Sequence, residues 1–63
     1  MTNDKIKHYL GAEVFNHISS LDADNLAKMK AELLKDINLH KLGTKVLFNR
    51  TIELEYINKR LKN

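Results

Sequence analysis

The segment from Thr44 to Lys62 constrains the fold most, because it carries two apolar stripes where a surface helix usually has one. Wound as a helix at about 100° per residue, it places a larger stripe within one quadrant and a smaller stripe on another side. The larger stripe consists of Val46, Leu47, Leu54, Ile57 and Leu61. The smaller stripe consists of Phe48, Ile52 and Tyr56. Polar residues separate the stripes on both flanks, namely Thr51, Glu55, Asn58 and Lys62 on one and Asn49, Glu53 and Arg60 on the other. Such a helix either lies between two neighbours or packs on its own chain with one stripe and on a partner with the other.

The same segment has a second interpretation, in which it forms a β-hairpin. Residues 51–57 alternate polar and apolar side chains and are rich in strand formers. Residues 44–48 would then be the partner strand, and the fold would be α+β with a C-terminal hairpin at 44–57. We favour the helix, because the turn Asn49-Arg50 lacks the glycine that two-residue hairpin turns prefer. The basic residues at 59–62 also suit the negative end of a helix dipole.

The chain has 63 residues, which predicts one domain of marginal stability. It contains no cysteine, so disulfides and thiolate metal sites are excluded. Its apolar runs are too short to span a bilayer, and the start Met1-Thr2-Asn3-Asp4 does not resemble a signal peptide. We therefore expect an intracellular, cytoplasmic protein without a membrane partner.

Two further helices are expected before this segment. The first covers residues 4–19, is capped by Thr2 or Asn3, and has one apolar face. Gly11 lies inside it, either as a tolerated weak point or as a place where another helix approaches closely. The apolar face of this helix consists of Ile6, Leu10, Val14, Ile18 and Leu21.

The second helix covers residues 22–41, with Ser20 or Asp22 as its cap. Gly43 is expected in the left-handed conformation that ends it, and Thr44 as the cap of a third helix over residues 45–62. The apolar face of the second helix consists of Ala23, Leu26, Ala27, Leu33, Leu34 and Ile37. The predicted fold is an all-α, three-helix domain over residues 1–63, completed by dimerisation.

The sequence contains no catalytic motif. It has no glycine-rich phosphate loop, no HExxH and no serine or cysteine nucleophile signature. Each histidine follows an acid by four residues, and the three pairs are Asp4/His8, Glu13/His17 and Asp36/His40. These pairs lie on different segments without a His-xxx-His spacing, so we interpret them as solvated ion pairs. We expect no enzyme activity, no cofactor, no metal and no small-molecule substrate.

The leading functional hypothesis is a protein-interaction module that self-associates, or that docks on a larger protein and regulates it. The larger stripe is expected to face inward, which leaves Phe48, Ile52 and Tyr56 as the interface. Arg50 is a further interface candidate, although its guanidinium can instead reach Glu53 on the same helix. Nine lysines and seven asparagines, without proline, glutamine or tryptophan, are typical of AT-rich genomes, including those of phages and mobile elements.

The alternative hypothesis is a nucleic-acid-binding protein, because the net charge is +3. Its phosphate contacts would come from Lys45, Lys59, Arg60 and Lys62, which we expect to act together. A helix-turn-helix motif is not supported. With Gly43 in the turn, Leu39 and Asn49 occupy the positions that need a small and an apolar residue.

Overall fold

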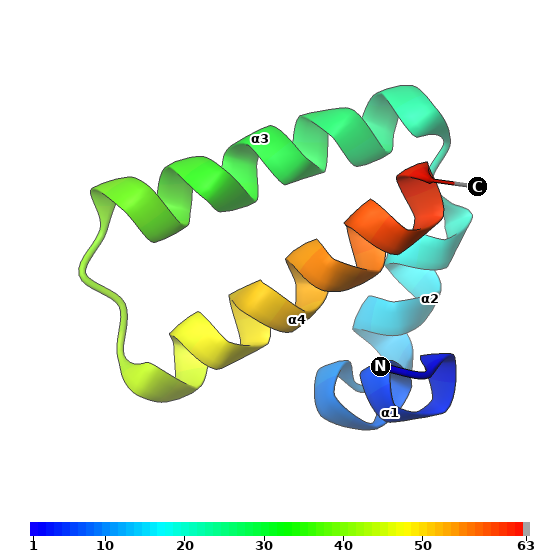
Figure 1. Ribbon diagram of the computed structural model, residues 1–63, viewed down its shortest axis with the longest axis horizontal. Coiled ribbons are helices and arrows are strands. Elements are labelled where there is room, and N and C mark those ends of the chain that lie inside the picture. Colours follow the sequence, from blue (N-terminus) through cyan, green and yellow to red (C-terminus); the bar gives the residue numbers. More distant parts are fainter. Residues whose placement is uncertain (63) are drawn as a thin grey trace.

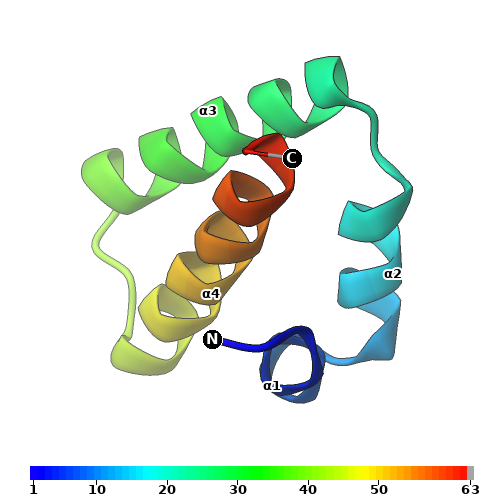
Figure 2. The ribbon, with the colours of Figure 1, turned by 45° about the vertical axis from the view of Figure 1, so that its right-hand side comes forward.

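The computed structural model describes residues 1–62 and consists of four α-helices (Figure 1). They are α1 (Asn3–Leu10), α2 (Ala12–Ser20), α3 (Ala23–Leu39) and α4 (Thr44–Leu61). The all-α prediction is confirmed. The hairpin alternative is wrong, because 44–61 is helical throughout and no strand occurs in residues 1–62. Figure 2 shows α4 in the middle, with α3 on one side and α1 and α2 on the other.

The first predicted helix is interrupted at Gly11, so the three-helix count is wrong. Gly11 has φ 88° and ψ 155°, a region that essentially only glycine occupies. Its N–H donates to the Lys7 carbonyl at 2.8 Å and its carbonyl accepts from the Phe15 N–H at 3.0 Å, so the residue ends α1 and begins α2. A Cβ atom there would meet nothing within 4 Å, which rules out close helix approach as its role. The break lets Ile6 of α1 and Ile18 of α2 both reach the core, where each is fully buried.

The helix starts follow local capping chemistry in two of the predicted places. The Thr2 hydroxyl accepts from the Lys5 N–H at 3.3 Å, and the Asp22 carboxylate accepts from the Asn25 N–H at 2.9 Å. The start of α4 differs from the prediction. Gly43 is extended, with φ −66° and ψ 158°, and is itself the N-cap, while Thr44 is the first helical residue. The left-handed Gly43 and the Thr44 cap are therefore wrong, and the chain crosses from α3 to α4 through an extended connection.

The core lies between α4 and the other three helices. The outward orientation predicted for Ile52 and Tyr56 is wrong, because their exposed fractions are 3% and 5%. With neighbours on both sides, α4 buries a wide arc that includes Ile52 and Tyr56 of the smaller stripe, Ile57 of the larger stripe and Glu53 of the polar strip between them, while Asn49 and Arg60 of that strip are partly buried. The buried core residues are Ile6, Ile18, Leu26, Leu33, Ile52, Tyr56 and Ile57.

The polar strip of α4 faces inward because its groups find partners there. Arg60 Nη1 donates to the carbonyls of Ile18 at 2.6 Å and Leu21 at 2.8 Å, which satisfies the C-terminal end of α2. Glu53 is buried and pairs with Arg50 at 3.0 Å. Within residues 1–62 no buried side-chain nitrogen or oxygen lacks a hydrogen-bond partner. Burying these polar groups therefore does not leave unpaired charge or dipoles in the core.

Tyr56 connects α4 to α2 through both its ring and its hydroxyl. The ring stacks on Phe15, with centroids 4.7 Å apart. The hydroxyl lies 2.6 Å from Ser19 Oγ, which itself donates to the Phe15 carbonyl at 2.8 Å. Because the Ser19 proton is already used, Tyr56 is the donor in this pair. Ile52 and Tyr56 of the smaller stripe thus belong to the monomer's own core, whereas Phe48 stays exposed.

Candidate protein-interaction surface

The large exposed apolar side chains gather where α3 turns into α4. We call this segment, residues 39–48, the elbow; it lies at the end of the molecule opposite α2 (Figure 1). Four of the eight large exposed apolar residues lie in it, with exposed fractions between 40% and 67%. These four are Leu39, Val46, Leu47 and Phe48. The elbow is therefore the most apolar part of the described surface.

The helical geometry of α4 explains why these side chains stay exposed. Val46, Leu47 and Phe48 are consecutive, so they point in three directions about 100° apart. A helix that is apolar on all sides needs neighbours on all sides. Figure 2 shows α3 on one side of α4 and α1 on another, and the three side chains remain 40–45% exposed. Val46 and Leu47 of the larger stripe are exposed for this reason, although the sequence predicted the stripe to face inward. Leu61 of the same stripe is also exposed, at the other end of α4.

An aromatic contact extends the elbow surface onto α1. The rings of Tyr9 and Phe48 meet edge to face, with centroids 5.3 Å apart and planes at 82°. Tyr9 is 47% exposed, and its ring also meets that of His8 at 5.6 Å. Each aromatic ring holds the other in a defined orientation. The surface is thus ordered on the α1 side as well as on α4.

The elbow is also cationic. It contains Lys41 and Lys45 and no acidic residue. The nearest acids in sequence lie outside this segment: Asp36 is 3.9 Å from His40, and Glu53 is 3.0 Å from Arg50. The first turn of α4 holds no acid, and its N-cap provides no side-chain acceptor. Within residues 1–62 neither lysine forms an ion pair, so both charges lie beside the apolar side chains and are available to a partner.

The residues predicted as an interface are thus divided between core and surface. Phe48 is exposed, Arg50 forms the ion pair with Glu53 that the sequence suggested, and Ile52 and Tyr56 are buried. Sequence reasoning missed Tyr9, Leu39 and the outward position of Val46 and Leu47. One signal was available, namely the run of three consecutive apolar residues in one helical turn.

The four cations predicted to contact nucleic acid do not form one patch. Lys45 precedes Lys59 by 14 helical residues, which separates them by about 21 Å along α4. The Lys59 ammonium donates to Asn3 Oδ1 at 2.8 Å, and Arg60 is occupied by the carbonyls at the end of α2. Lys45 therefore lies near the opposite end of α4 from Lys59 and belongs to the elbow. Arg60 instead joins α4 to the end of α2.

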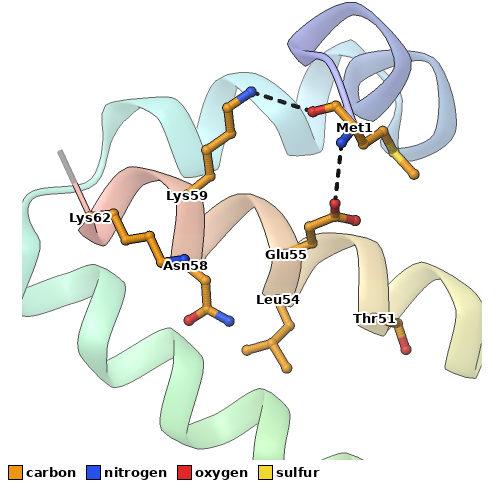
Figure 3. Close-up of a pocket in the computed structure, with 7 residues that line it drawn as sticks. All are labelled: Met1, Thr51, Leu54, Glu55, Asn58, Lys59 and Lys62. Carbon is orange, nitrogen blue, oxygen red and sulfur yellow. Dashed lines mark hydrogen bonds and ion pairs between the residues drawn. The ribbon is translucent and has the colours of Figure 1, made fainter.

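A groove of about 680 Å³ lies on the outer face of α4, beside the start of the chain (Figure 3). Leu54 contributes its apolar part. The Met1 ammonium lies 3.6 Å from Glu55, and Lys59 donates to the Met1 carbonyl at 3.4 Å. Within residues 1–62, no group of three His, Asp or Glu residues is placed to hold a metal ion.

No family model, curated protein or solved structure matches this chain. None of the helices formed by residues 1–62 combines the length and the apolar character needed to cross a bilayer. The function is therefore argued from the surface itself.

Proposed function

We propose that this protein is a non-enzymatic interaction module that docks on a larger protein through the elbow and regulates it by occupying its surface. One observation carries the proposal: Val46, Leu47 and Phe48, which spread over about 200° around the first turns of α4, are each 40–45% exposed. Contiguous exposed apolar residues of this kind mark interaction sites in soluble proteins.

The accessible area and the radius of gyration are both somewhat larger than those of a typical compact monomer of this size. The accessible area is 4631 Å² for a mass of 7.3 kDa, whereas a typical monomer of that mass exposes about 4200 Å². The radius of gyration is 11.3 Å, compared with about 10.6 Å for a compact domain of this length. The chain thus exposes more surface than its size requires. A partner that covers the elbow would remove apolar surface from water, which is the main favourable term in protein association.

Photo-crosslinking from defined positions tests the proposal. A photoreactive amino acid replaces Leu47 in one variant and Leu61 in another, and both are produced in the cells that encode the protein. The two positions are matched, because both lie on α4 and are 40% and 37% exposed, but Leu61 is at the opposite end of the helix. We expect Leu47 to crosslink repeatedly to one larger protein and Leu61 to give no such product.

Equal products from both positions, or none from Leu47, would contradict the proposal. A product of twice the mass of this chain from Leu47 would show self-association in place of docking on a larger protein.

A further inference from the structure

We infer that the elbow recognises an acidic amphipathic helix of the partner protein, in which carboxylates flank an apolar stripe. The inference rests on the proposed function and specifies the chemistry of the partner.

The distribution of charge is the reason to expect an acidic partner. Residues 39–48 contain two lysines and no acid, and the rest of the chain has nine basic and eight acidic residues. Most of the net charge of +3 is therefore concentrated beside the exposed apolar side chains. A second copy of this chain would bring Lys41 and Lys45 against like charges, which disfavours a symmetric dimer through the elbow. A partner with carboxylates at these positions has complementary charge.

The exposed aliphatic side chains are the reason to expect an apolar stripe on the partner. Leu39, Val46 and Leu47 are aliphatic and exposed, and they gain from contact with apolar side chains but not from contact with phosphates. Nucleic acid would therefore leave them without a counterpart. An anionic bilayer would also provide an apolar phase, and binding to vesicles is therefore tested beside the peptides. A helix with an apolar stripe between rows of carboxylates satisfies both features.

Binding to three designed peptides tests the inference directly. All three share one apolar stripe of leucines at helical spacing and differ only at the flanking positions, which are Glu, Gln or Lys. Affinity is measured by fluorescence anisotropy, and the binding site is mapped by amide chemical shifts of the ¹⁵N-labelled protein. We expect the Glu peptide to bind about tenfold more tightly than the Gln peptide, the Lys peptide to bind weakest, and the shifts to concentrate on residues 39–48 and Tyr9.

Matched variants separate charge from burial. Lys41→Glu with Lys45→Glu should weaken binding of the Glu peptide about tenfold and strengthen binding of the Lys peptide. Lys28→Glu with Lys62→Glu changes the net charge equally at exposed positions outside the elbow, and it should change affinity by less than about threefold. Leu47→Gln should weaken all three peptides, while Leu61→Gln should not. Circular dichroism of each variant verifies that the helices are retained.

Each contrary result has a distinct meaning. Equal affinity for the Glu and Gln peptides would overturn the acidic partner but leave docking at the elbow in place. Absence of binding by every peptide, or shifts outside the elbow, would overturn the inference, while the photo-crosslinking above decides the proposed function separately. Tighter binding to a single-stranded oligonucleotide or to vesicles containing phosphatidylglycerol would overturn it in favour of nucleic acid or a bilayer.

Discussion

Replacing Arg60 with methionine tests whether this residue joins helices or remains available to a ligand. Arg60 Nη1 donates to the carbonyls of Ile18 and Leu21, at 2.6 Å and 2.8 Å, and so closes the C-terminal end of α2 against α4. Methionine keeps most of the aliphatic stem and removes both donors. The two carbonyls would then have to find water at a partly buried helix end.

The expected loss follows from these two hydrogen bonds. A hydrogen bond from a charged donor contributes about 1.5–3 kcal/mol. Arg60 is only partly buried and its two bonds share one nitrogen, so we expect about 2 kcal/mol for the pair together. In a domain of this size 1 kcal/mol corresponds to about 7 °C in Tm, which gives a decrease of about 14 °C. A chain of this length has only about 3–9 kcal/mol of total stability, so the effect should be large.

Thermal and urea unfolding followed by circular dichroism measure the change. Lys59→Met is the matched control, because Lys59 is the neighbouring cation on α4 and is exposed; its loss should cost less than about 0.5 kcal/mol. Arg60→Lys should fall between the two, because an ammonium keeps the charge but not the planar fork. A stability of Arg60→Met within about 0.5 kcal/mol of the original protein, or equal to that of Lys59→Met, would refute the proposed contact with α2.

Three further substitutions test the core and the helix break. Ile52→Glu should unfold the monomer, because it places a carboxylate at a site that is 3% exposed; a fully retained helical circular dichroism signal would contradict the inward orientation of this residue. Gly11→Ala should cost about 1–3 kcal/mol in urea unfolding because of the positive φ. Gly43→Ala, at a negative φ with nothing within 4 Å of its Cβ, should cost less than about 1 kcal/mol, which reflects only the poorer N-cap. Leu33→Ala should cost about 2–5 kcal/mol, and its neighbour Leu34→Ala, which is exposed, less than about 1 kcal/mol; similar costs for both would place the inner face of α3 elsewhere.

Local features of the sequence were sufficient to predict the all-α fold and much of the core. The caps at Thr2 and Asp22 act within three residues, so they are visible in the sequence itself. The face that includes Ile6 and Ile18 was also predicted correctly, even though Gly11 divides the helix that carries it. Among the interface residues Phe48 was predicted to be exposed, and it is. These features depend on residue type and spacing along a single helix.

The orientation of α4 was decided by the tertiary structure. The sequence shows two stripes and a polar strip and suggests the Arg50–Glu53 pair, but it does not show that Glu53 is buried or that Arg60 reaches the carbonyls of α2. Arg60 can face inward only because the break at Gly11 and the turn after Ser20 bring the carbonyls of α2 to it. Likewise Tyr9 joins the elbow surface through a contact between α1 and α4 that no local pattern encodes. Which side of a helix is buried depends on all of its neighbouring helices together. Polar side chains can therefore lie on the buried side of α4 when the neighbouring helices provide hydrogen-bond partners, and apolar side chains such as Val46 and Leu47 then stay exposed.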